Sequence, residues 1–303
     1  MIEGQEDVSW DDWLAIARSC EENGIPTLFR SDHYLSVFGA DGRGSLDAWG
    51  TICGLAAATS RLRLGTMVSP TSFRHPSVLA KLIATADQIS GGRIEPGVGA
   101  GWHQPEHDAF GFPYLPMGER MDVLEEQLEI LAGRWSTGEF EFHGEHYEMT
   151  PVDAQPKPVQ SPLPLIIGGN AKPRSAALAA RFATEYNTTN PTLEDVVERR
   201  ARVASAWKDA GRDPETLRFS VMTGAAVGRD EAEADDRLRR ARERARRPDL
   251  EYRFHGAPER LIDQFGAWGR AGVDRVMVQL LLHDDLEQIE ILGREVAPAL
   301  RSS

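Results

Sequence analysis

The sequence contains little cysteine and no long apolar run. Only two of its 303 residues are cysteines, Cys20 and Cys53, and their separation matches no metal-binding or redox motif. We therefore expect both thiols to be buried in a protein of the reducing cytoplasm. No run approaches the 18 apolar residues of a membrane-spanning helix, and residues 1–7 lack the basic and apolar regions of a signal peptide.

Positive charge is also scarce. The formal net charge is −13, which repels nucleic acid and gives an anionic ligand no long-range attraction, so such a ligand needs local donors. Apolar residues make up 41% of the chain, enough for a large core. A chain of this length forms either one α/β barrel or two ordinary domains.

Strand-like and helix-like segments alternate along most of the chain. Strands are expected near residues 27, 63, 95, 166, 185, 222 and 277, and a stub over residues 2–5 adds an eighth. Eight βα units favour a (β/α)8 TIM barrel formed by residues 1–303 as one domain, with a truncated first strand. A doubly wound open sheet is the alternative.

Helix signals separate these strands. Capping boxes at Ser9 and Thr192 and the proline at position 76 mark three helix starts, and a last helix is expected over residues 286–300. Pro96 interrupts the strand expected over residues 94–98 and implies a local bend.

The alternation breaks once, in an insertion over about residues 136–163. Residues 139–142 and 146–149 alternate with period two around a short turn, which predicts a surface β-hairpin. A proline-rich connector follows the hairpin over residues 151–164.

Asp32 and His33 directly follow the strand expected over residues 26–31. Two ionisable side chains in this position lie at the carboxyl rim of a parallel sheet, where α/β folds place their chemistry. The alternative is an ordinary turn, in which Asp and His are common.

Two glycine-rich segments also follow strands. Residues 97–101 superficially match a dinucleotide-binding loop, but the spacing is wrong and no acidic residue is placed to hold a ribose, so a Rossmann nicotinamide site is rejected. Gly168, Gly169 and Asn170 lie between a strand and a helix, where backbone amides and the helix dipole can hold a phosphate.

Taken together, several segments give the chain a family resemblance over nearly its whole length. It resembles the luciferase-like flavin and deazaflavin oxidoreductases, and the Asp-His pair with the Ser-Gly-Gly-Arg run favours the branch that uses the deazaflavin coenzyme F420. The FMN-dependent branch is the close competitor. The segments are 31–33, 64–66, 74–76, 87–93, 97–102, 106–107, 110–111, 119–120, 156–160 and 166–169.

This resemblance implies a cofactor ring in the mouth of the barrel. A cis peptide at Met67-Val68 is expected behind the ring, and His33 is expected to transfer a proton beside it, because an imidazole titrates near neutral pH. Asp32 is expected to orient His33 or to meet the polar edge of the cofactor.

The other expected site residues also come from strand ends and the loops that follow them. Gly168, Gly169 and Asn170 are expected to hold the cofactor phosphate. The remaining cofactor residues are Gly99 and Asn187, and the substrate residues are Trp102, Tyr34 and Glu106.

No metal site is expected. His103 and His107 have a helical metal-pair spacing, but Pro105 interrupts the helix that this spacing needs. The arginine-rich segment 237–247 is expected to be a solvated helix face balanced by acidic residues. The alternative is that Arg240 and Arg244 meet the anionic tail of coenzyme F420.

Three functions follow from the resemblance. The first is hydride transfer between F420 and a small organic substrate, and the second is an FMNH2-dependent monooxygenase of the alkanal or alkanesulfonate type. The third is a non-catalytic flavin-binding protein. A cytoplasmic homodimer without nucleic-acid or membrane partners is expected.

Overall fold

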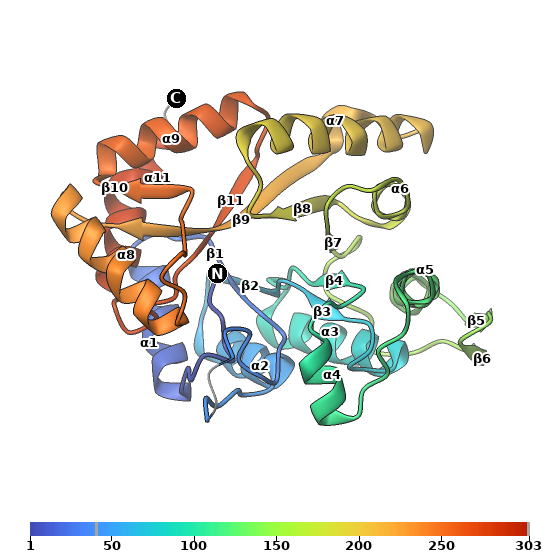
Figure 1. Ribbon diagram of the computed structural model, residues 1–303. Helices are drawn as coiled ribbons and strands as arrows, with labels where there is room; N and C mark the ends of the chain where they lie inside the picture. The colour runs from blue at the N-terminus through green and yellow to red at the C-terminus, as the bar shows by residue number, and fades with distance from the viewer. Residues whose placement is uncertain (40–41, 302–303) are drawn as a thin grey trace.

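The computed structural model describes residues 1–39 and 42–301, which form a parallel barrel surrounded by helices (Figure 1). Ala40, Asp41, Ser302 and Ser303, which the one-domain prediction includes, lie outside the described residues. The barrel strands are β1 (Thr27–Arg30), β2 (Arg63–Thr66), β3 (Ser69–Pro70), β4 (Gly97–Gly99), β7 (Ile166–Gly168), β8 (Glu185–Thr189), β9 (Arg218–Val227) and β11 (Arg275–Gln279).

The first two residues close the ring of strands. The Ile2 amide donates to the Phe29 carbonyl at 3.0 Å, and the Ile2 carbonyl accepts from the Ser31 amide at 3.1 Å. On the other side, the Met1 ammonium donates to the Val278 carbonyl at 2.9 Å. Because these bonds join β1 to β11, the predicted (β/α)8 barrel with a truncated first strand is confirmed, and the open doubly wound sheet is excluded.

The helices begin where the sequence signals indicated. Ser9 and Thr192 form complete capping boxes, and Pro76 occupies the first turn of its helix. The helices are α1 (Trp10–Glu22), α2 (Ala48–Ala58), α3 (Pro76–Ser90), α4 (Gln104–Phe110), α5 (Met117–Trp135), α6 (Pro173–Phe182), α7 (Leu193–Asp209), α8 (Glu231–Ala245), α9 (Pro258–Arg270), α10 (Glu287–Ile291) and α11 (Ala297–Arg301).

The predicted hairpin is present. Strands β5 (Phe140–His143) and β6 (Glu148–Val152) pair in an antiparallel ladder and extend outward beside α5 (Figure 1). The hairpin contributes no strand to the barrel and lies apart from its closed ring of strands.

Two predicted strands are shorter than expected. The strand predicted over residues 94–98 begins only at Gly97, because Pro96 has no amide to donate and Ile94 makes just an isolated bridge to Leu64. The strand predicted over residues 62–68 ends at Thr66, and β3 follows after the Met67-Val68 peptide.

Two other predictions were incomplete. Strand β9 spans ten residues, and its last three pair with β10 (Phe254–Gly256), a strand that is not among those expected from the sequence. The helix predicted over residues 286–300 contains a π-helical turn over Leu292–Val296. In this turn the backbone at Gly293 lies against Asn23 at the end of α1, and a Cβ atom at position 293 would clash with the Asn23 carbonyl.

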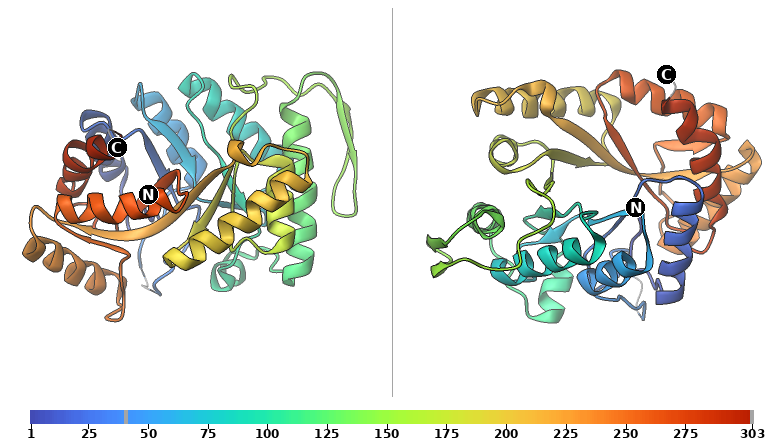
Figure 2. Two further views of the ribbon diagram at one scale, coloured as in Figure 1. Left: turned by 90° about the horizontal axis from the view of Figure 1, so that it is seen from above. Right: turned by 180° about the vertical axis from the view of Figure 1, so that it is seen from behind.

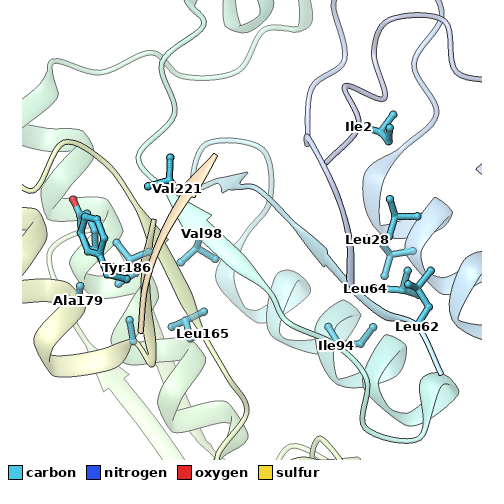
Figure 3. Close-up of a cluster of buried hydrophobic side chains, with 14 of the residues drawn as sticks. Ile2, Leu28, Leu62, Leu64, Ile94, Val98, Leu165, Ala179, Tyr186 and Val221 are labelled. Carbon is cyan, nitrogen blue, oxygen red and sulfur yellow. The ribbon is translucent and has the colours of Figure 1, made fainter. Parts of the chain in front are cut away.

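Side chains alternate between the outside and the inside of the barrel. Ile2, Leu28 and Leu64 point outward into the main core (Figure 3). The inward-facing side chains form a second cluster. It consists of Met1, Phe29, Met67, Ile166, Met222 and Met277.

An ion-pair network fills the amino end of the barrel. Glu95 accepts hydrogen bonds from Arg63 and Arg275, and Arg275 also lies 3.6 Å from Glu185. These residues occupy the beginnings of their strands, so charged side chains block this end. Ligand chemistry is therefore expected at the opposite end.

We call the junction of β1 and β11 the seam, and a cavity of about 730 Å³ lies there. Met1 and Ile2 are among the residues that line it. Its walls are mostly apolar and come from β1, β11 and the helices α1, α9 and α11. Figure 2 shows α1 beside the last helices of the chain, with which it packs.

The two cysteines differ in their surroundings. Cys20 is buried, and burial raises the pKa of its thiol to about 12. Cys53 is only partly buried, so the prediction of two buried thiols holds for one of them. Within residues 1–39 and 42–301, no helix combines the length and apolarity needed to cross a bilayer.

Candidate active site

The carboxyl ends of the strands form what we call the barrel mouth, and most predicted site residues lie there. Asp32 and His33 directly follow β1, Gly99 and Gly168 end β4 and β7, and Asn187 lies within β8. The parallel register places these strands side by side around the ring.

Asp32 points away from the barrel interior. Its carboxylate is only 1% exposed and accepts hydrogen bonds from Ser69 Oγ at 2.7 Å and from Arg74 Nη1 at 2.6 Å. Arg74 also binds Asp47 at 2.6 Å. Asp32 therefore anchors the turn before α3, and the described residues show no hydrogen bond from it to His33. That it meets the polar edge of the cofactor stays a prediction.

Glu106 orients His33 instead. Its Oε1 atom lies 2.9 Å from Nδ1 of His33, and its other oxygen accepts the backbone amides of Tyr34 and Leu35. The Glu106 side chain is fully buried on α4. These three contacts suit Glu106 to position His33, and its place in the lining of the substrate pocket stays a prediction.

The two groups shift each other's titration. Burial lowers the pKa of His33, but the hydrogen bond and charge of Glu106 outweigh this effect and place the pKa above its ordinary value of 6.5. Burial raises the pKa of Glu106, but the contact with His33 and two backbone amides brings it below its usual range. The Glu106 carboxylate can only accept, so Nδ1 of His33 carries the shared proton and Nε2 remains for other partners.

Helix α4 forms despite Pro105, because proline lies in the first turn, where its missing amide costs nothing. The helix does not create a metal pair. Nδ1 of His107 bonds to the His103 carbonyl at 2.8 Å, and its Nε2 bonds to Ser72 Oγ at 2.7 Å. Within the described residues, no cluster of three potential metal ligands occurs.

Aromatic side chains surround His33. The ring of Trp102 meets that of His33 edge-on at 5.8 Å and is 61% exposed, in the position predicted for a wall of the site. Tyr34 packs on Phe73 at 5.2 Å, and its hydroxyl donates to Asp47. The Tyr34 hydroxyl is therefore committed to protein groups.

Three glycines surround the side chain of Val68. The Met67-Val68 peptide is cis, as the resemblance implied. A Cβ atom would lie 3.0 Å from Val68 at Gly97, 2.8 Å at Gly99 and 3.3 Å at Gly168. Gly99 and Gly168 therefore have a packing role in the mouth, since a larger residue would displace the Val68 side chain.

The predicted phosphate site at Gly168, Gly169 and Asn170 differs from the expectation in the groups that it offers a ligand. The amide of Gly169 donates to the Asn187 carbonyl at 2.9 Å and is not available to a ligand, because strand pairing continues to this residue. The side chain of Asn170 accepts from Arg199 Nη1 at 3.2 Å, and the same atom donates to Thr188 Oγ1 at 2.6 Å.

Arg199 is thus a functional candidate that the sequence did not reveal. It lies on α7, where a charged residue ordinarily faces solvent, but its side chain crosses to the ends of β7 and β8 and is largely buried. The only available signal was its place one turn after the capping box at Thr192. A cation here fits an anionic group better than the backbone amides alone.

The interior of the mouth is polar. Asn187 Nδ2 donates to Ser220 Oγ at 2.9 Å. Glu3, at the end of the first stub, is only 7% exposed and accepts hydrogen bonds from the side-chain amides of Gln5, at 2.7 Å, and Gln279. Sequence reasoning missed Glu3, although residues alternating inward along the stub could have indicated it.

The arginine-rich helix α8 is not simply a solvated face. Arg237 is buried and bonded to Asp285 and Glu287. Arg240 also binds Asp285, and Arg244 bonds to the Glu6 carbonyl at 3.1 Å. Intramolecular partners thus engage the arginines that were considered for the tail of coenzyme F420, and these contacts attach α8 to the loops of the mouth.

The mouth fits a ring-bearing cofactor with an anionic tail. His33 offers a free Nε2 atom, the glycines around Val68 keep that wall narrow, and Arg199 with Asn170 offers polar contacts for an anion. The arrangement can hold and move a proton at His33 and can bind a negative group between β7 and β8.

A model of the luciferase-like monooxygenase family matches residues 2–296, so the chain belongs to this family. An uncharacterised protein of Mycobacterium bovis is 37% identical over 169 residues, which is 56% of this chain and 58% of that protein. An FMNH2-dependent dimethylsulfone monooxygenase of Pseudomonas putida is 26% identical, over 98% of this chain and 90% of its own length.

Solved structures agree on the fold. The F420-dependent tetrahydromethanopterin reductase of Methanopyrus kandleri has a TM-score of 0.83 and 20% identity, covering 99% of this chain and 97% of its own. An F420-dependent secondary alcohol dehydrogenase has a TM-score of 0.84 and 21% identity, covering 97% and 96%. At these identities, the likeness carries the fold alone.

Proposed function

We propose that this member of the luciferase-like family transfers a hydride between coenzyme F420 and a small organic substrate, with His33 moving the accompanying proton. The observation that carries this proposal is the 2.9 Å contact between His33 and Glu106 at the barrel mouth. A histidine held in one tautomer by a buried carboxylate is suited to giving and taking a proton at its other nitrogen.

Each residue then has a defined part. When bound, F420 supplies or accepts the hydride. His33 holds the proton at Nε2, and Glu106 fixes the ring and stabilises its protonated form. Arg199 and Asn170 bind the anionic part of the cofactor, and the Met67-Val68 segment borders its ring.

An FMNH2-dependent monooxygenase is the second candidate. It is supported by the 26% identity with the dimethylsulfone monooxygenase over nearly the whole of both chains. Such chemistry needs a pocket that excludes water. We favour F420 because the Asp-His pair at residues 32–33 and the Ser-Gly-Gly-Arg run at residues 90–93 resemble the F420 branch.

Cofactor titration tests the proposal. Purified protein is titrated with F420 and, separately, with FMN and reduced FMN, and binding is followed by cofactor fluorescence or absorbance. Preferential binding of F420 is expected. Binding of reduced FMN without binding of F420 would overturn the proposal and support the monooxygenase.

The variant His33→Ala separates an enzyme from a binding protein. In an F420 enzyme, this variant keeps cofactor affinity and loses turnover, because the cofactor contacts lie elsewhere. The exposed His146→Ala serves as the control and should change neither quantity.

A further inference from the structure

The hydroxyl of Tyr252 is buried without a hydrogen-bond partner among the described residues. Tyr252 lies in the segment between α8 and β10. Buried tyrosine hydroxyls usually have a partner, because an unpaired polar group loses its bonds to water and gains nothing in return. It is one of eight such buried side-chain atoms among the described residues, and its place in the fold makes it a candidate for pairing with a group from outside the chain.

Tyr252 lies at the barrel mouth. Its ring covers Gly224 on β9, where a Cβ atom would overlap the ring carbons. Gly224 is in register with Gln279 on β11, and Gln279 donates to Glu3. The glycine, the glutamine and the glutamate thus connect the ring of Tyr252 to the polar interior of the mouth.

The charge of Glu3 acts on both Tyr252 and His33. Burial raises the pKa of Tyr252, and the charge of Glu3 raises it further. The same charge contributes to the raised pKa of His33. At neutral pH, Tyr252 therefore keeps its proton and is a donor.

We propose that Tyr252 is a specificity-determining residue whose hydroxyl donates a hydrogen bond to a neutral oxygen of the substrate, a hydroxyl or a carbonyl. This inference deepens the proposed function and rests on it for the identity of the reaction. It adds that the substrate oxygen binds on the β9 and β11 side of the mouth, next to the ends of β7 and β8 where Asn170 and Arg199 meet.

The surroundings favour a neutral, largely apolar substrate. An anionic group at Tyr252 would lie near the Glu3 carboxylate and be repelled. Tyr252 packs against an apolar cluster of Ala241, Ala245, Leu281 and Leu282. A substrate with an apolar body and one neutral oxygen satisfies both features.

A matched pair of probes tests the hydroxyl. Benzyl alcohol and ethylbenzene have similar shape and differ by one hydroxyl. Calorimetric titration of the full chain without cofactor is expected to show a preference for benzyl alcohol. Tyr252→Phe should weaken benzyl alcohol binding roughly two- to tenfold and leave ethylbenzene unchanged.

Tyr147→Phe is the control, since the Tyr147 hydroxyl already accepts from Gln127 Nε2 at 2.8 Å, and it should change neither affinity. Wild-type protein labelled at the tyrosine ring carbon that bears oxygen gives a second measurement. The chain has only five tyrosines. The Tyr252 resonance should shift with benzyl alcohol and not with ethylbenzene. Because this measurement uses wild-type protein, it does not depend on the folding of a variant.

Three results would overturn the inference. The first is that Tyr252→Phe weakens the binding of both probes equally. The second is that it weakens the binding of neither, and the third is that the Tyr252 resonance does not shift with benzyl alcohol. None of these depends on F420. A chain that keeps the probe preference but fails to bind F420 would refute the proposed function and leave the substrate subsite in place.

Discussion

Nδ1 of His33 lies 2.9 Å from Oε1 of Glu106, although the two residues are 73 positions apart in the chain. One follows a barrel strand, and the other lies on a short helix in the loop after β4. The fold alone brings them together. Their pairing determines the tautomer and the charge of the group proposed to move the proton.

Replacing Glu106 should lower the pKa of His33. Glu106→Gln removes the charge that opposes burial, and the remaining desolvation favours the neutral ring. The pKa is measured from the pH dependence of the His33 ring resonances by NMR. The exposed Glu141→Gln should leave it unchanged, and a His33 pKa that stays above 6.5 in Glu106→Gln would contradict the assigned role of Glu106.

The same pair predicts a pH window for stability. The pKa of His33 is raised, so its contribution is complete below 6.5 and is lost as pH rises through the folded-state pKa. The pKa of Glu106 is lowered, so its contribution is complete above 4.5 and is lost as pH falls through that pKa. The free energy of unfolding of wild type relative to His33→Asn should therefore be greatest between pH 4.5 and 6.5, and a flat difference from pH 4 to 9 would exclude this coupling.

Removing the charge of Asp32 should destabilise the fold without much effect on His33. Asp32→Asn leaves the largely buried guanidinium of Arg74 with Asp47 as its carboxylate partner, which costs about 3 kcal/mol in the free energy of unfolding. Denaturant titration measures this loss. A large fall in the His33 pKa in the same variant would show that Asp32, and not Glu106, controls the ring.

Arg199 should contribute to cofactor affinity. Arg199→Gln removes a cation from the ends of β7 and β8, so affinity for F420 should fall about tenfold or more, and its dependence on salt should decrease. Arg202→Gln is a matched control one turn away, where the exposed guanidinium pairs with Glu198. Equal effects of the two variants would indicate general charge instead of a site.

Two glycine replacements should change the free energy of unfolding in opposite directions. Gly99→Ala would force a methyl group against Val68 and cost about 1–3 kcal/mol. Gly269→Ala, on α9, meets no neighbour within 4 Å and should stabilise the protein by about 0.5–1 kcal/mol through helix propensity. Thermal unfolding distinguishes the two, and stabilisation by Gly99→Ala would refute the packing around Val68.

The barrel was predictable because its signals are local. Alternating periods of two and 3.6 residues, the capping boxes at Ser9 and Thr192 and the proline at position 76 each depend on neighbouring residues. Strand β10 was missed because a three-residue strand has too few residues to show a period, and it forms only against the long β9.

The site was only partly predictable, since its key contacts join distant segments. The place of His33 after β1 follows from the strand pattern, but its contact with Glu106 could not be predicted, because the two residues lie on separate segments. Arg199 and Glu3 have ordinary local surroundings. Only the closed ring of strands brings their side chains to the mouth.

The seam has a consequence for the segment that carries His33. Along that side, β1 is tied to the rest of the barrel by the Ile2 contacts with Phe29 and Ser31, and Ser31 stands two positions before His33. Amide protons here should exchange with solvent sooner than those between β8 and β9, where five residue pairs are in register. Local opening of the contacts between Ile2 and β1 would therefore move the His33 imidazole before it disturbs the contacts of Arg199 at the ends of β7 and β8.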